Sequence, residues 1–496
     1  MSTTELLRRE WAAFRRPGRL IALAVAALSV IALGVLFAFG DRSSCDGSCP
    51  AVPAADDGSI VTDKFWFLHR DLGREGGITV RMTSMTGTIT YPPPNHDKIV
   101  PGLVPWAKAG IIIKDGVRPG SRYAALTMTG GHGVRFQYDY RHDVAGGASG
   151  VSARSPRWLR LTRSGDTITG SESTDGKQWR TVATATLGGL PDTLQVGLFA
   201  TSPGDLTLDE IGLGGAVGKL RHTQTVGVFD NVAVNGAADG AWRSEPVGGT
   251  LNEADWEKHH NPSGTVQRDG VITISGTGDI GPHDFEGART ARDTLRGLTI
   301  GLIIVLVVAA LYGARTARRT PSRRVVTVSA AIVGAATFVT GLVAVGVVVP
   351  LGMAVLRSNG VPVWPLPMPT GARVVVGLAV GLALCAVLTY GLGLWLRRSW
   401  AAIVVGLSLI AVPYAVATLP LLPDAVSEWL LRLTPAAGLA IQQTMTEYPQ
   451  VNVHYAPSTG YFPLPWWAGL ALLLAYTTLA MRIALGRKPA AGNDWR

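Results

Sequence analysis

The sequence has 496 residues, of which 47% are hydrophobic and only 16% are charged, a balance that is too apolar for a typical soluble protein. The formal net charge of +10 would suit a nucleic-acid-binding protein, but many of the basic residues flank long apolar runs instead of forming a patch on a folded domain. Nucleic acid is therefore not expected as a partner. Residues 41–294 resemble an ordinary soluble domain, whereas most long apolar runs lie outside that span, so the composition predicts two environments for one chain.

Residues 1–18 are predicted to form a cytoplasmic amphipathic helix. Leu7, Trp11 and Phe14 recur at positions i, i+4 and i+7, which places them on one helical face, while arginines occupy the other faces. This pattern predicts a helix that lies in the membrane interface. The alternative is a simple topology signal, because basic flanks alone suffice to orient a membrane helix.

Residues 19–40 contain the first predicted transmembrane helix. The stretch 20–39 carries no charge, and about 20 residues at 1.5 Å each span the hydrocarbon core of a bilayer. No Ala-x-Ala cleavage site follows it directly, so we expect a retained anchor and not a removed signal peptide. Arg15, Arg16 and Arg19 precede it and predict that the N-terminus stays in the cytoplasm.

The predicted linker 41–56 contains Cys45 and Cys49. Outside the cell this Cys-Asp-Gly-Ser-Cys segment could close a small disulfide. It could equally be a Cys-x-x-x-Cys metal or redox site, but no recognisable redox fold accompanies it. The third cysteine, Cys385, lies inside a later apolar run and is expected to pack there or face lipid.

Residues 57–290 are predicted to form an extracellular antiparallel β-sandwich, jelly-roll-like in outline. Short alternating runs bounded by Gly, Asp and Pro follow one another at roughly 8 to 12 residue spacing, with no helical period between them. The clearest predicted strands are 77–82, 109–114, 123–129, 134–140, 158–162, 167–171, 179–184, 194–200, 225–234 and 271–275.

Residues 295–486 are predicted to contain transmembrane helices 2 to 6, at 298–314, 325–350, 373–396, 400–422 and 465–485. Six spans return the C-terminal tail, residues 487–496, to the cytoplasm. Charge gives an independent check, because the loops expected inside are the ones rich in arginine. These are Arg315, Arg318, Arg319, Arg323 and Arg324 after helix 2, and Arg397 and Arg398 after helix 4.

Three segments resemble the type-2 family of ABC transporter permeases. They are Leu-Leu-Arg-Arg-Glu-Trp-Ala-Ala-Phe-Arg-Arg before helix 1, Tyr-Gly-Ala-Arg-Thr at 312–316 with the arginine pair that opens helix 3, and Leu-Thr-Pro-Ala-Ala at 433–437. With the six-helix count they cover residues 1–40 and 295–496. The resemblance implies a permease subunit of an exporter in the cell membrane. The chain departs from the family pattern in its first outer loop, which is often small there and here holds about 250 residues, so substrate handling is expected to differ.

The inserted domain resembles concanavalin-like or laminin-G-like β-sandwiches, of the kind often attached to glycoside hydrolases. The matching segments are Lys-Ala-Gly-Ile-Ile-Ile-Lys-Asp at 108–115, Gly-Val-Arg-Phe-Gln-Tyr at 133–138, and Gly-Asp-Thr-Ile at 165–168 followed by Asp-Gly-Lys-Gln-Trp at 175–179. The resemblance implies carbohydrate binding, for which Trp66, Trp106, Tyr138 and Tyr140 could supply stacking rings. Aromatic residues on sandwich strands are more often core, and acids in hairpins are usually solvated turn residues, so no enzyme activity is expected.

No P-loop motif occurs in these 496 residues, and no Cys/His spacing typical of a metal site does. ATP and magnesium are therefore expected on a separate cytoplasmic ATPase subunit, with a second permease subunit, a copy of this chain, completing the transporter. The residues expected to contact the ATPase are Glu10, Trp11, Phe14, Arg15, Arg315, Arg318, Arg319, Arg323 and Arg324. The alternative function is a membrane-anchored carbohydrate-binding or sensor protein, although an anchor needs only one helix.

Overall fold

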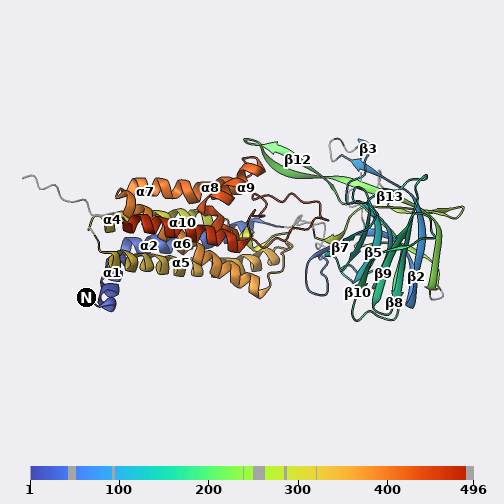
Figure 1. The fold of residues 1–496 in the computed structure, drawn as a ribbon, viewed down its shortest axis with the longest axis horizontal. Coiled ribbons are helices and arrows are strands. Elements are labelled where there is room, and N and C mark those ends of the chain that lie inside the picture. Colours follow the sequence, from blue (N-terminus) through green and yellow to red (C-terminus); the bar gives the residue numbers. More distant parts are fainter. Residues whose placement is uncertain are drawn as a thin grey trace, which may run out of the picture.

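The computed structural model of the chain describes residues 2–42, 52–91, 95, 97–237, 240–249, 263–283, 288–319 and 321–486. A helical bundle and a β domain follow one another along the long axis of the molecule (Figure 1). The bundle is built from both ends of the chain. The β domain is built from residues between the first two long helices.

Six helices in the described part of the chain are long and apolar enough to cross a membrane, as the sequence predicts. They are α2 (Pro17–Gly40), α4 (Leu298–Ala317), α5 (Arg323–Ser358), α6 (Met368–Leu396), the continuous run of α7 (Ser399–Gly406), η2 (Leu407–Ala411) and α8 (Val412–Thr418), and α10 (Trp466–Gly486). The run α5 extends past Pro350, where the prediction ended it. Proline removes one backbone hydrogen bond but is tolerated inside long apolar helices.

Among the described residues, four shorter helices lie at the two ends of the bundle. At one end, α1 (Thr3–Phe14) starts with a capping box between Ser2 and Glu5, and Pro17 then starts α2 in a new direction. At the other end, next to the β domain, lie η1 (Ala291–Leu295), α9 (Asp424–Leu433) and η3 (Pro435–Gln442). We call these the α1 end and the sheet end of the bundle (Figure 1).

The β domain contains one large antiparallel sheet of 15 strands and a two-stranded sheet that pairs β1 with β17. The strands are β1 (Val61–Asp63), β2 (Phe65–Thr90), β3 (Ile99–Pro101), β4 (Lys108–Lys114), β5 (Tyr123–Thr129), β6 (Val134–Tyr138), β7 (His142–Ala145), β8 (Arg157–Ser164), β9 (Thr167–Ser173), β10 (Arg180–Thr186), β11 (Leu194–Thr201), β12 (Asp205–Ile211), β13 (Gly215–Ala237), β14 (Arg243–Val247), β15 (Gly264–Arg268), β16 (Val271–Gly276) and β17 (Ile280–Pro282). All pairings between these strands are antiparallel, and β1 with β17 joins the two ends of the domain.

The strand β2 explains why the expected sandwich forms one continuous sheet. Its first part pairs with β11 and β14, and its later part pairs with β8 and β13. The main path runs β10-β9-β8-β2-β11-β4-β5-β6-β7. The sequence predicted only residues 77–82 of β2, because charged residues and glycines interrupt the alternating pattern before that point.

Two apolar clusters fill the β domain. The larger one contains Ile111, Leu126, Phe136 and Leu198, and the smaller one lies on the opposite face of β4 and β5, around Ile112 and other residues. Every residue of β4 and β5 is therefore buried, which a half-exposed alternating strand would not be. These two strands form the centre of the domain.

Candidate functional site

Two cavities adjoin at the sheet end of the bundle. One has a volume of about 540 Å³ and lies between η1, the segment 445–459 and the hairpin of β12 and β13. The other has a volume of about 470 Å³ and lies among α2, α4, α8 and η3. Both are lined by Arg292, Asp293, Arg296 and Ser458, so we treat them as one site and call it the sheet-end chamber. Each volume lies in the range of small-molecule pockets.

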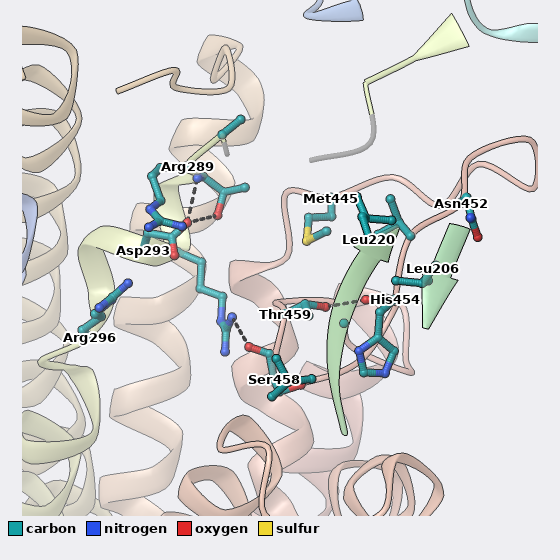
Figure 2. A pocket seen from close by; sticks show the side chains of 16 residues that line it. Leu206, Leu220, Arg289, Asp293, Arg296, Met445, Asn452, His454, Ser458 and Thr459 are labelled. Carbon is teal, nitrogen blue, oxygen red and sulfur yellow. Dashed lines mark hydrogen bonds between the residues drawn. The ribbon is translucent and has the colours of Figure 1, made fainter. Parts of the chain in front are cut away.

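The arginines of the chamber lie in or beside the short helix η1: Arg292 is within it, Arg289 precedes it and Arg296 is its C-cap residue. The Asp293 carboxylate accepts hydrogen bonds from the Thr290 backbone N–H (2.8 Å) and hydroxyl (3.0 Å), which fixes the start of η1. Figure 2 shows Arg289, Asp293 and Arg296 on one side of the first cavity, with Leu206, Leu220 and Asn452 on the other. Side chains in and beside η1 thus face the β12–β13 hairpin across the cavity.

The chamber carries unbalanced positive charge. The Arg289 guanidinium makes two hydrogen bonds with Asp41, at 2.9 and 3.2 Å. Arg292 instead donates to the backbone carbonyls of Pro457 (3.1 Å) and Ser458 (3.2 Å), and no carboxylate of the described residues forms an ion pair with it. Arg296 lies 4.0 Å from the already paired Asp41. The three arginines therefore face two carboxylates, Asp41 and Asp293, and Arg292 is the one without an ion pair in the described structure.

The part of the second cavity that lies among the helices has four apolar lining residues, Phe37, Leu295, Ala415 and Leu419. Thr299, Tyr414, Thr418 and Gln442 line it as well. The buried Tyr414 hydroxyl is satisfied by the Gln442 amide, which donates to it at 3.1 Å. The chamber thus joins a basic half, formed by η1, to an apolar half, formed by the helices.

The hairpin of β12 and β13 reaches from the β domain to the bundle (Figure 1). We call residues 205–221 the arm. At its tip the Leu213 N–H donates to the Leu421 carbonyl at 2.8 Å, between α8 and α9. Near its base the Asn452 side chain donates to the Gly204 carbonyl at 2.7 Å. The arm therefore forms one wall of the chamber and contacts the helices that form another.

We expect Gly215→Val to detach the arm from the bundle. A Cβ atom at Gly215 would lie 2.2 Å from the Pro420 carbonyl oxygen, which is backbone and cannot rotate away. Such overpacking costs about 1–3 kcal/mol, so tryptic cleavage after Lys219 should become about tenfold faster or more. Gly188→Val is the matched control, because no atom lies within 4 Å of that added Cβ. Equal cleavage rates in both variants would contradict the contact.

The residues expected to contact an ATPase are placed differently along α1 than the sequence pattern suggested. The buried stripe is Leu6, Glu10 and Phe14, each four residues apart. Leu7 and Trp11, expected to share a face with Phe14, are 48% and 42% exposed. The buried stripe includes a carboxylate, which a search for apolar spacing does not select.

Glu10 and Phe14 connect α1 to the bundle. The Glu10 carboxylate accepts a hydrogen bond from the Ser329 hydroxyl of α5 at 3.1 Å. Phe14 packs edge-on against Tyr312 of α4, with ring centroids 5.2 Å apart. Phe14 is fully buried within its own chain. Phe14, expected to contact an ATPase, therefore packs inside the bundle instead, and Trp11 and Leu7 form the exposed apolar surface of α1.

The arginines expected to contact an ATPase are all exposed, and they gather with α1 at the same end of the bundle. They are Arg15, Arg315, Arg318, Arg319, Arg323 and Arg324. Arg397 and Arg398 after α6 are exposed there too. In the described part of this end, the acidic residues are Glu5 and the buried Glu10. The surface around Leu7 and Trp11 is strongly basic.

The four aromatic residues proposed for glycan binding do not form a platform. Tyr140 is 2% exposed, and its hydroxyl donates to the Asp63 carboxylate at 2.7 Å. Trp106 is buried and stacks on His132. The Trp66 indole N–H donates to Ser244 at 2.9 Å, and Tyr138 stacks on His142. These contacts within the domain leave no shared face of exposed rings among the four.

The remaining predictions concern the three cysteines and metal binding. Cys45 and Cys49 lie outside the described residues, and Cys385 is a buried free thiol. The described ranges contain no group of three or more His, Cys, Asp or Glu side chains that could hold a metal ion.

The sequence interpretation missed Arg289, Arg292 and Arg296. Their signal was a basic segment directly before helix 2, on the side where arginine is expected to be scarce.

Comparison with known proteins identifies no family. No family model and no curated protein matches the chain. Among solved structures, a functionally unknown protein from Saccharomyces cerevisiae is 18% identical, with 39% of this chain and 85% of that chain covered and a TM-score of 0.22. Scytalido-glutamic peptidase is 7% identical over 44% and 99%, with a TM-score of 0.26. A GH43 protein from Bacillus licheniformis is 14% identical over 26% and 24%, with a TM-score of 0.17. These scores carry no argument about function.

Proposed function

We propose that the chain is the permease subunit of an ABC exporter in the cell membrane. A separate cytoplasmic ATPase, which binds ATP and magnesium, would supply the energy, and a second copy of this chain would complete the pathway. The observation that carries the proposal is the gathering of α1 and the loop arginines at one end of six membrane-length helices, opposite the β domain. Basic loops mark the cytoplasmic side of membrane proteins.

This orientation puts the β domain and the sheet-end chamber outside the cell and the exposed face of α1 inside. Leu7 and Trp11, surrounded by arginines, suit a partner with an apolar groove and an acidic rim. Force on α1 would reach α5 through the Glu10–Ser329 hydrogen bond. It would reach α4 through the contact between Phe14 and Tyr312, whose ring lies 5.8 Å from that of Tyr390 in α6.

The test is co-purification of the full chain with its ATPase from native membranes in mild detergent. We expect Leu7→Ala/Trp11→Ala to weaken association by about 2 kcal/mol per buried hot-spot residue, roughly 30-fold each, while retaining every arginine. Trp429→Ala on α9 is the matched control, because that side chain is 55% exposed at the sheet end. Wild-type chain that purifies without any ATP-hydrolysing subunit would contradict the proposed function.

A separate outcome concerns the contact surface alone. If the double variant retains its ATPase as well as the Trp429→Ala control does, the exposed face of α1 is not the docking surface. The helix would then serve only as a topology signal.

A further inference from the structure

The sheet-end chamber combines two features that single out one class of ligand. Its basic half contains Arg292, which forms no ion pair with a described carboxylate, and Arg296, which shares the single carboxylate of Asp41 with Arg289. A guanidinium binds phosphate or carboxylate groups through paired hydrogen bonds, and its planar geometry favours such groups over a simple anion. This half suits a negatively charged head group.

The apolar half suits a hydrocarbon chain. Phe37 and Leu419 line it and are 44% and 50% exposed, so they also belong to the outer flank of the bundle. In the proposed orientation this flank faces the outer leaflet, which gives an alkyl chain access from the side. The Arg296 guanidinium stacks over the Phe37 ring at 5.1 Å and so marks the boundary between the two halves.

We propose that the chamber binds an amphiphile with an anionic head group, held by Arg292 and Arg296, and an alkyl chain that lies against Phe37, Tyr414 and Leu419. The inference deepens the proposed function and rests on it for the role of the bound molecule as cargo. The binding itself requires no subunit other than this chain. A resident anionic phospholipid and an exported lipid-linked anion share this chemistry.

The wall of the chamber that the arm forms also suits such a ligand. The arm contributes Leu206, Val217 and Leu220 opposite η1, and its tip rests on the connection between α8 and α9. An amphiphile that enters from the helices would meet the arm before the β domain. The arm is therefore the element through which occupancy of the chamber could reach the outer domain.

Native mass spectrometry of the full chain in an uncharged detergent tests the proposal. The chain is given equimolar phosphatidylglycerol and phosphatidylcholine, and the retained lipid is counted. We expect one phosphatidylglycerol per chain in the wild type. In Arg296→Gln retention should fall about tenfold, because one charge-assisted interaction is lost. This variant loses the 4.0 Å ion pair with Asp41, which stays paired with Arg289, and the cation stacking over Phe37, but no hydrogen bond of the described structure, so its fold should persist. Arg357→Gln is the control, because Arg357 is exposed at the sheet end and does not line either cavity.

Further measurements test the apolar half of the site separately from the basic half and distinguish the possible sources of the ligand. Ala415→Phe fills the apolar half, so it should abolish phosphatidylglycerol retention while the arginines remain. Excess inorganic phosphate should compete poorly, and effective competition would mean that a free anion is the ligand. A native lipid extract then shows whether the retained molecule is a bulk phospholipid or a lipid-linked anion.

Equal retention of phosphatidylglycerol and phosphatidylcholine, or equal retention by Arg296→Gln and Arg357→Gln, would overturn the proposal. No ATPase is present in this assay. Its failure therefore leaves the permease proposal standing, and loss of ATPase co-purification leaves the binding result standing.

Discussion

Asp63→Ala is expected to unfold the β domain at a much lower urea concentration than the wild type. The Lys114 ammonium and the Asp63 carboxylate are both fully buried and lie 2.8 Å apart. Lys114 also donates to the Ser121 carbonyl at 2.8 Å and to the Tyr140 hydroxyl at 3.0 Å. Burial lowers the pKa of Lys114, and Asp63 opposes this shift. Without Asp63 the lysine must lose its proton or remain an uncompensated charge, which costs about 3–5 kcal/mol.

The measurement is pulse proteolysis of the full chain across a urea series, which reads the free energy of unfolding of the β domain. Asp192→Ala is the matched control, because its partner Arg74 and Asp192 are 62% and 81% exposed, and such pairs contribute less than about 1 kcal/mol. In Asp63→Ala/Lys114→Met most of the lost stability should return, since no unpaired buried charge remains at this position. A double variant no more stable than Asp63→Ala would show that the ion pair is not the cause.

The same ion pair illustrates what the sequence could predict. The strand that contains Lys114 was found from its residues Ala-Gly-Ile-Ile-Ile, and its bounds agree with the structure within one residue. The sequence pattern indicated neither burial nor a partner for its two terminal lysines, Lys108 and Lys114. Both are buried, and Lys108 pairs with Asp279 while Lys114 pairs with Asp63. The two carboxylates come from the C-terminal and N-terminal ends of the domain's sequence, which β1 and β17 bring side by side. Pairing between residues this far apart in the chain leaves no local pattern.

The helices were predicted more completely than the site. Length and apolar composition define a membrane-length helix without any tertiary information, and all six agree. The register of α1 was wrong, because its buried face contains Glu10, whose partner Ser329 lies in α5. The chamber was not predicted at all. It depends on η1, the arm and the segment 445–459, which meet only in the folded chain.

Gly313→Leu is expected to prevent stable assembly of the helical bundle. A Cβ atom at Gly313 would lie 2.3 Å from the Tyr390 carbonyl oxygen, and one at Gly393 would lie 2.7 Å from the Ala310 carbonyl oxygen. The helices α4 and α6 therefore approach each other backbone to backbone, as small residues permit in membrane helices. Because the obstacle is backbone, the loss in free energy of unfolding should reach or exceed about 1–3 kcal/mol, the usual cost of overpacking.

Size-exclusion chromatography and thermal unfolding of the full chain in detergent measure this effect. Gly313→Leu should lose the monodisperse peak or melt at a far lower temperature. Gly18→Leu is the matched control, since no atom lies within 4 Å of a Cβ added there. A variant that melts like this control would show that α4 and α6 can separate freely. The result also bears on coupling, because Tyr312, beside Gly313, is the side chain against which Phe14 of α1 packs. A displaced α4 would remove that contact, so α1 could no longer move α4 even if the ATPase still bound.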